Sequence, residues 1–214
     1  MGVITVSSSF GSGGSVVASR LADRLGWSLH NRAIPEEVAS RLSVPLDAAV
    51  AHDEASDTRI GQLLARFSVH LASQAPGIIP PETFLDPAAF RENSESIIRR
   101  IADAGNTVIV GRAGAIALHG FPGALHVRFD GSRESRILQA AAALGLTTDE
   151  AAKRLATTDR ARSLYVKQFY GRDWADPSLY HMVLDSTELS LDSCVEIVLA
   201  ALEGGRQVSR HRLA

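Results

Sequence analysis

The feature that most constrains this chain is its beginning, where a short apolar segment leads into a turn rich in glycine. Residues 3–26 read VITVSSSFGSGGSVVASRLADRLG. Residues 3–6 suit a buried strand, and the segment after the turn has apolar residues at helical spacing. The predicted apolar stripe consists of Val16, Val17, Leu21 and Leu25, and Gly26 is expected to cap the helix at its C-terminus. A strand, a glycine turn and a helix in this order predict a place for an anion at the start of the helix.

The glycine turn matches only in part the phosphate-binding pattern G-x-x-x-x-G-K-[ST], in which the lysine reaches the outer phosphates. In this register the pattern starts at Ser8, and Gly14 stands where the lysine belongs. We expect the residues of the turn to bind phosphate groups: Gly11, Ser12, Gly13, Gly14 and Ser15. Ser15 is expected to bind Mg²⁺ through its hydroxyl, or alternatively to serve only as the helix N-cap.

Segments typical of strands alternate with segments typical of helices along the rest of the chain. Strands are expected at WSLH, TVIVG, ALHVRF and HMVLD, and helices after Pro35, Pro45, Asp86, Ser132 or Asp130, Thr147 and Ser190. This alternation predicts an α/β fold of three layers, a parallel sheet with helices on both faces, and ligands at the carboxyl ends of the strands. One domain is expected over residues 1–205, with a helical insertion at 46–90, a lid region at 147–175 and a tail at 206–214.

Two further segments have arginines at positions where a bound anion would stabilise their charge. In VIVGRAG, Arg112 leaves a predicted buried strand directly into a loop, so its charge is costly unless a phosphate, or a carboxylate such as Asp185, meets it. Arg160 and Arg162 lie in one predicted helix, but residues two apart do not share a face, so a solvated surface is an alternative. Phosphoryl transfer needs mainly positioning and cationic stabilisation, which arginines together with Mg²⁺ could supply.

The composition of the chain limits the classes of molecule that it is expected to bind. A net charge of −2 disfavours a nucleic-acid polymer, and the single cysteine, Cys194, excludes a disulfide framework and is expected to be buried in a helix. The histidines are scattered without the spacing of metal ligands, so each is expected to be packed or on the surface. No apolar run approaches the ~18 residues that a membrane span needs. We therefore expect a cytoplasmic protein that binds small molecules.

Three separated motifs now agree: the glycine turn, residues 108–137 (VIVGRAGAIALHGFPGALHVRFDGSRESRI) and residues 157–202, which begin TTDRARSLYVKQFYGRDW. Together they resemble the cytidylate-kinase-like family, relatives of bacterial cytidylate kinase among the P-loop nucleoside monophosphate kinases. The resemblance covers most of the chain and is weakest at residues 46–90. It implies a P-loop kinase-like core that uses ATP and Mg²⁺, a nucleotide-binding insertion and a lid that carries arginines.

The resemblance also implies roles for single residues. The glycine turn would hold the phosphates of ATP, Arg112 would hold the monophosphate, and Arg160 and Arg162 would be the catalytic arginines of the lid. Arg133 or Arg136 would assist them. The acceptor would meet Asn31, Arg32, Arg112 and Asp185, of which Asn31 and Asp185 stand where bacterial cytidylate kinase has strand-end acids.

Three departures from that family leave more than one function open. Gly14 replaces the lysine, Ala113 replaces the acid after the Gly-Arg pair, and Asn31 replaces an aspartate. The first hypothesis is a kinase that phosphorylates a pyrimidine nucleoside monophosphate or a similar phosphorylated acceptor, with Arg20, Arg112 or a lid arginine supplying the missing charge. The second is a non-catalytic nucleotide-binding regulatory protein, a homodimer through residues 46–90. The third is an anion-binding enzyme of another reaction class.

Overall fold

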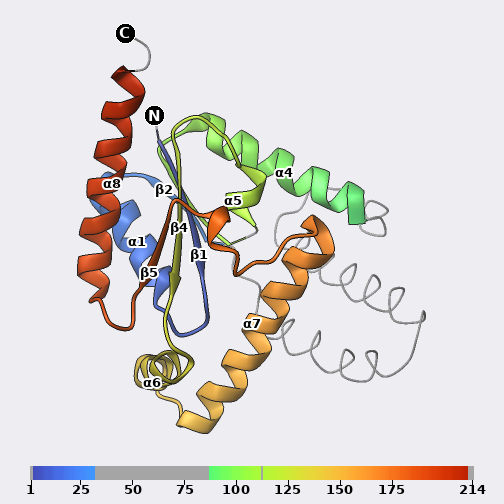
Figure 1. Ribbon diagram of the computed structural model, residues 1–214, viewed down its shortest axis with the longest axis vertical. Coiled ribbons are helices and arrows are strands. Elements are labelled where there is room, and N and C mark those ends of the chain that lie inside the picture. The colour runs from blue at the N-terminus through green and yellow to red at the C-terminus, as the bar shows by residue number, and fades with distance from the viewer. Residues whose placement is uncertain (1, 32–86, 112, 212–214) are drawn as a thin grey trace. The chain divides into compact units, whose positions relative to one another are not determined.

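The protein is represented by a computed structural model that describes residues 2–31, 87–111 and 113–211 (Figure 1). The predictions for Arg32, for Arg112 and for nearly all of the insertion at 46–90 lie outside these residues. The chain divides into two compact units. The first comprises residues 1–33, 98–156 and 175–214, and the second comprises residues 34–97 and 157–174.

The first unit is built on a five-stranded sheet in the order β2-β3-β1-β4-β5. All neighbouring strands are parallel, as the alternation of strands and helices predicted. The strands are β1 (Val3–Ser8), β2 (Ser28–Asn31), β3 (Thr107–Val110), β4 (Ala124–Asp130) and β5 (Met182–Asp185). Because β1 is central, the loop that follows it is flanked by the ends of β3 and β4.

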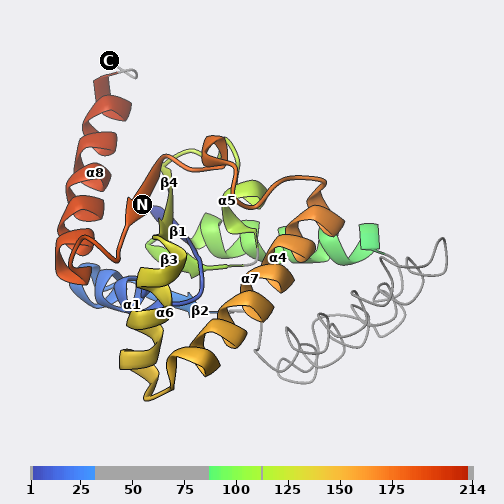
Figure 2. The same cartoon turned by 60° about the horizontal axis from the view of Figure 1, so that its bottom comes forward.

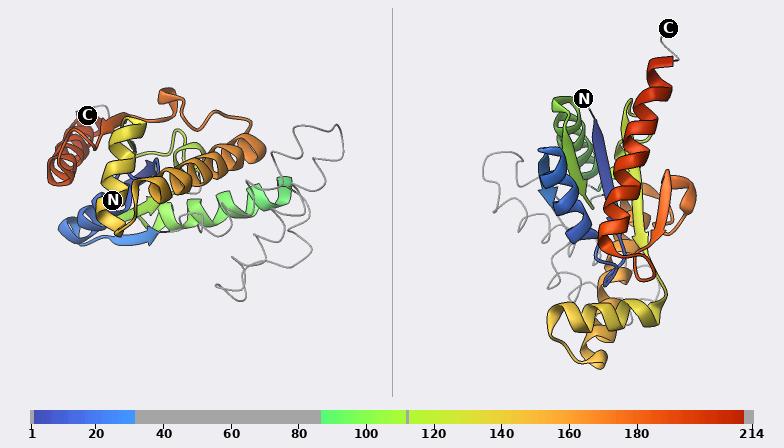
Figure 3. Two further views of the ribbon diagram at one scale, coloured as in Figure 1. Left: turned by 90° about the horizontal axis from the view of Figure 1, so that it is seen from below. Right: turned by 90° about the vertical axis from the view of Figure 1, so that its left-hand side faces the viewer.

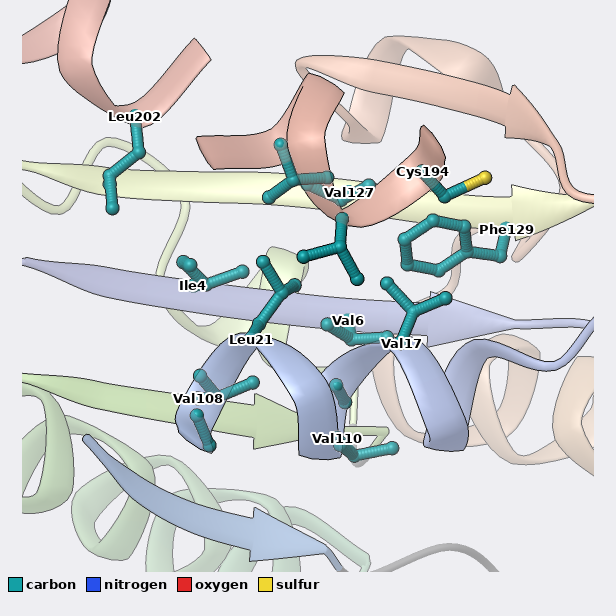
Figure 4. Close-up of a cluster of buried hydrophobic side chains, with 14 residues drawn as sticks. Ile4, Val6, Val17, Leu21, Val108, Val110, Val127, Phe129, Cys194 and Leu202 are labelled. Atoms are coloured by element: carbon teal, nitrogen blue, oxygen red, sulfur yellow. The ribbon is translucent and has the colours of Figure 1, made fainter. Parts of the chain in front are cut away.

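One face of the sheet is covered by helices α1 (Gly14–Leu25) and α8 (Leu191–His211), which the right-hand view of Figure 3 shows in front of the strands. Figure 4 shows the core between these layers, in which Phe129 of β4 lies close to Val17 and Cys194. Cys194 is buried, as predicted. Val16 is 44% exposed, so its place in the apolar stripe was wrong, because Val17 and Leu21 are the residues that face the sheet.

The opposite face of the sheet has an apolar region and a polar region. Near the amino ends of the strands, Ile98 and Ala102 of α4 (Pro87–Ala104) pack with Leu118, which follows α5 (Gly114–Ala117). Further along, the alternation of side chains in β1 and β4 brings Thr5 beside His126 and Ser7 beside Arg128. The carboxyl end of this face is therefore polar although it is buried.

Helices α6 (Arg133–Leu144) and α7 (Thr148–Tyr170) follow β4 directly (Figure 2). Their predicted starts are confirmed, because Ser132 accepts a hydrogen bond from the amide of Ser135, and Thr147 and Glu150 form a reciprocal capping box. A short 3₁₀ helix, η2, spans Pro177–Leu179. No helix in the described ranges combines the length and the apolar character needed to cross a membrane.

Helix α8 was predicted to end near Gly204 and Gly205, and this prediction is wrong. The helix continues to His211, and neither glycine has the positive φ that a glycine cap adopts. By contrast, Gly26 ends α1 with a φ of 62°, as predicted. Of these two sites, a glycine therefore ends the helix only where it adopts a left-handed conformation itself.

The described part of the second unit consists of the first half of α4 and the second half of α7, with the residues up to Trp174. Within α7, Arg162 lies 3.7 Å from Asp159, and the ring of Tyr165 packs against the rings of Phe169 and Tyr170. Burial, together with the neighbouring Tyr165 and Glu95, raises the pKa of Tyr170 well above its ordinary value. Its hydroxyl is therefore neutral at physiological pH.

Candidate phosphate-binding site

The loop between β1 and α1 has the backbone conformation of an anion-binding turn. Gly11 and Gly13 adopt positive φ angles of 82° and 71°, which side-chain-bearing residues rarely adopt. Gly13 is the N-cap of α1, and no side chain caps the helix. The alternative that Ser15 is only an N-cap is therefore wrong, and the first amides of the helix are left without a capping side chain.

Several amides of this loop lack a hydrogen-bond acceptor. Among the described residues, none accepts from the N–H groups of Gly11, Gly13, Gly14 and Ser15. Successive amides that converge around left-handed residues form a concave site for an anion, and the positive end of the helix dipole reinforces it. They are four of the five residues that the sequence predicted to bind phosphate, and the fifth, Ser12, donates its amide and its hydroxyl to Ser9 O.

Most carbonyl groups of the same loop already accept hydrogen bonds from the protein. Ser9 O accepts from the amide and the hydroxyl of Ser12, at 3.2 and 2.8 Å. Phe10 O accepts from Arg136 Nη1 at 2.9 Å, and Ser12 O accepts from Ser186 Oγ at 2.6 Å. With these oxygens held by the protein, the loop offers a ligand donors rather than acceptors.

Gly14, which stands in the position of the lysine, is packed against Ser8. A Cβ added to Gly14 would overlap the Cβ of Ser8, and it would lie 3.0 Å from Ser8 Oγ and 3.3 Å from Phe129 Cδ2. Gly14 is buried, so the backbone cannot easily withdraw. In this conformation, the loop has no room for a lysine side chain.

A cluster of two buried arginines and one partly exposed carboxylate supports the loop from the end of β4. Asp130 Oδ2 accepts from Arg128 Nη2 at 2.7 Å, and Asp130 Oδ1 lies 3.6 Å from Arg136 Nε. Arg128 Nη2 also donates to Ser9 Oγ at 3.0 Å, and its guanidinium lies over the ring of Tyr180. Burial raises the pKa of Asp130, but hydrogen bonds from Arg128 and Ser9 outweigh burial and hold it below its ordinary value. The carboxylate is therefore ionised.

Arg128 was not among the predicted site residues, although the sequence carried a signal for it. It is the charged residue inside the apolar strand segment ALHVRF, and only 4% of its side chain is exposed. A guanidinium in the middle of a buried strand needs a partner. Its partner lies two residues further along the same strand, where both side chains fall on one face.

The side chain of Gln139 adds a further donor near the loop. Its Nε2 atom is buried and finds no acceptor among the described residues. It lies 3.2 Å from the position that a Cβ on Gly13 would occupy. A buried polar atom without a partner is uncommon in folded proteins, and a bound anion would be a suitable acceptor.

The remaining predicted residues are distributed over several places. Asn31 is exposed at the end of β2, and Asp185 ends β5, so these two lie at opposite edges of the sheet. Asp185 Oδ1 accepts from the hydroxyl and amide of Thr187, and these bonds hold the pKa of Asp185 below its ordinary value. The position of Arg112 is flanked by left-handed residues, Gly111 and Ala113. Arg160 and Arg162 belong to α7 in the second unit.

A metal ion at the loop would need ligands from the surrounding residues. No cluster of three or more His, Cys, Asp or Glu side chains suited to a metal occurs in residues 2–31, 87–111 and 113–211. Ser15 is exposed in the first turn of α1, beside the free amides. One hydroxyl suits Mg²⁺ that is held chiefly by phosphate oxygens and water.

The sheet order, the glycine loop after the central strand and the free amides define a P-loop kinase-like α/β fold. The chain belongs to the cytidylate kinase-like family, whose model matches residues 3–188. A solved structure of an uncharacterized protein from Eubacterium ventriosum has a TM-score of 0.64 and 20% identity, with coverage of 95% of this chain and 98% of that chain. Shikimate kinase from Bacteroides thetaiotaomicron has a TM-score of 0.47 and 13% identity, with coverage of 94% and 98%.

A curated relative matches a smaller part of the chain. Uronate isomerase from Corynebacterium glutamicum is 27% identical over 109 residues, which are 51% of this chain. The match spans 21% of the length of that isomerase. The name uronate isomerase describes that larger protein.

Proposed function

We propose that this protein is a nucleotide kinase that transfers a phosphoryl group from ATP to a pyrimidine nucleoside monophosphate or a similar phosphorylated acceptor. The observation that carries the proposal is the set of amides without acceptors at Gly11, Gly13, Gly14 and Ser15, in a loop whose carbonyls are largely engaged. Donors without acceptors suit a polyanion. Membership of the cytidylate kinase-like family supports a nucleotide as the source of that polyanion.

The proposal gives each part of the chain a task. The loop amides bind the phosphates of ATP, and Arg112, Asn31, Arg32 and Asp185 bind the acceptor. Arg160 and Arg162 stabilise the charge that spreads over the transferred group. Mg²⁺, which Ser15 would help to hold, supplies charge neutralisation at the phosphates when it is bound. An oxygen of the acceptor phosphate forms the new P–O bond as ADP leaves.

A second candidate function is favoured by the contact between Ser8 and Gly14. Because this contact leaves no room for a lysine, the loop binds phosphate through amides alone. A protein with this loop could bind nucleotide and not turn it over, acting as a regulatory module. A single cation near the transferred group can change a rate by several powers of ten, so the distinction depends on the arginines.

The experiment that separates the two functions combines calorimetry with a turnover assay. Purified protein is titrated with ATP and Mg²⁺, and is then incubated with ATP, Mg²⁺ and each of a panel of nucleoside monophosphates. Formation of ADP together with a nucleoside diphosphate supports the kinase, and Arg112→Gln, Arg160→Gln and Arg162→Gln should each slow it. Saturable ATP binding without any diphosphate supports the regulatory module. Absence of ATP binding would overturn both.

A further inference from the structure

Arg136 holds the anion-binding loop by its main chain. Its Nη1 donates to Phe10 O at 2.9 Å, and its Nε donates to Gly131 O at 3.0 Å. The side chain is only 10% exposed. We propose that Arg136 is a positioning residue, which fixes the peptide unit between Phe10 and Gly11 so that the Gly11 amide faces the anion. This inference rests on the proposed function, because it concerns how the same loop is held ready for phosphate.

The geometry of the peptide bond sets the direction of the Gly11 amide. In a trans peptide the C=O of one residue and the N–H of the next point in opposite directions. No cis peptide occurs in the described residues. Once Arg136 holds Phe10 O, the Gly11 N–H must point away from Arg136. This is one of the amides that lack an acceptor.

Ser186 acts in the same way on the peptide unit between Ser12 and Gly13. Ser186 Oγ donates to Ser12 O at 2.6 Å, and the amide on the other side of that peptide belongs to Gly13, which also lacks an acceptor. The two clamps come from different elements, Arg136 from α6 and Ser186 from the loop after β5. Each can therefore be removed without removing the other.

Arginine is needed at position 136 because its side chain must donate hydrogen bonds in two directions at once. Nη1 and Nε donate to carbonyls of different loops, and Nε also lies 3.6 Å from the carboxylate of Asp130. The planar guanidinium has donors fixed in such a fork, whereas a lysine ammonium is a point charge on a flexible stem. The backbone carbonyl of Arg136 also lies against Gly11, where an added Cβ would overlap it. The loop is thus packed onto this one residue.

The test uses inorganic triphosphate as the probe, with four forms of the full chain: wild type, Arg136→Gln, Arg136→Lys and Arg99→Gln. Arg99 is exposed on α4, so its substitution removes the same charge away from the loop. We expect both variants at position 136 to weaken triphosphate binding by about tenfold or more, in line with the loss of a charge-assisted hydrogen bond. Arg99→Gln should bind as the wild type does.

A residue-specific readout separates positioning from a general structural role. In ¹⁵N-labelled wild type, triphosphate should shift the amide signals of both Gly11 and Gly13. In Arg136→Gln the response of Gly11 should be lost, whereas that of Gly13, which Ser186 still clamps, should remain. If Arg136→Gln does not fold, Arg136→Lys carries the same comparison.

The outcomes distinguish the failure of this inference from that of the proposed function. Equal triphosphate binding by wild type and Arg136→Gln, or a Gly11 signal that still responds in the variant, would overturn the role of Arg136 alone. Lysine restoring full affinity would show that charge is what matters, and would also overturn the positioning role. A wild type that binds no triphosphate would overturn the proposed function, and the role of Arg136 with it.

Discussion

Ser8 and Gly14 fit against each other at the two ends of the anion-binding loop, because a Cβ on Gly14 would overlap the Cβ of Ser8. In the pattern G-x-x-x-x-G-K-[ST], these two positions are a glycine and the lysine. In this chain the first of these positions, Ser8, has a side chain, and the second, Gly14, has none. The missing lysine and the extra serine are therefore one coupled change, because a lysine at position 14 also requires removal of the Ser8 side chain.

Introducing the lysine should accordingly need both substitutions. Gly14→Lys alone is expected to lower the free energy of unfolding by about 2 kcal/mol or more, because the new side chain overpacks against Ser8. The double variant Ser8→Gly with Gly14→Lys should regain much of that loss and should bind triphosphate about tenfold more tightly than wild type. Thermal melts and calorimetry measure the two effects. Wild-type stability in Gly14→Lys would contradict the coupling.

Gly11 should tolerate no side chain. Gly11→Ala combines a left-handed φ of 82° with an overlap on the backbone carbonyl of Arg136. The matched control is Gly26→Ala, which has a left-handed φ of 62° and no neighbour within 4 Å. The control should cost about 1 kcal/mol, from backbone strain alone. Gly11→Ala should cost roughly 3 kcal/mol in denaturant unfolding and abolish triphosphate binding. Equal losses in the two variants would show that the close contact is unimportant.

Removing the clamp on Ser12 should weaken the loop. Ser186 is buried, and its hydroxyl donates to Ser12 O and, at 3.3 Å, to Asp130 O. Ser186→Ala is expected to lower the free energy of unfolding by about 1 to 2 kcal/mol. It should also weaken triphosphate binding, with the Gly13 amide signal losing its response. Ser178→Ala, at an exposed position in η2, serves as the control and should change neither quantity.

His126 should make the stability of the protein depend on pH. Burial, then repulsion by His181, lower the pKa of His126 from 6.5 to about 4, although a hydrogen bond to the backbone of Leu118 opposes the change. His119 adds a smaller repulsion. His126 is 3% exposed, and its Nδ1 lies 2.8 Å from Thr5 Oγ1. The folded protein therefore keeps this ring neutral where the unfolded chain would protonate it.

The sign of the effect follows from proton linkage. The unfolded state binds more protons between the two pKa values, so stability is complete above about pH 6.5 and is lost as the pH falls toward 4. The loss attributable to His126 is about 3 kcal/mol over that range. Denaturant unfolding at pH 7.5 and at pH 4.5 measures it. His126→Asn, which can keep the contact with Thr5, should remove most of the difference, and an unchanged difference would contradict the assignment.

The sequence predicted the elements because their signals are local. Gly26, Ser132 and the pair of Thr147 and Glu150 act within one helical turn of themselves, and the structure confirms each as a cap. The amides of the glycine loop were also predictable, because the loop and the first turn of α1 are adjacent in sequence.

The support of the loop could not be predicted in the same way. Arg128 meets Ser9, and Ser186 meets Ser12, only because β4 and β5 pair in a particular register beside β1. Register depends on the whole sheet rather than on any short segment. Arg136 was expected only as an assistant of the lid, whereas its hydrogen bonds in the first unit run to the main chain of Phe10 and Gly131.

The residues that donate hydrogen bonds to the loop lie late in the sequence. The pairs Ser9–Arg128, Phe10–Arg136 and Ser12–Ser186 are separated by 119, 126 and 174 positions. During synthesis, the loop emerges from the ribosome long before its partners exist. Contacts between residues so far apart in sequence form slowly, because closing a long loop costs entropy before the new contacts stabilise the chain. Nascent chains arrested before residue 186 should therefore remain unable to capture a nucleotide, and binding should appear only as translation nears its end.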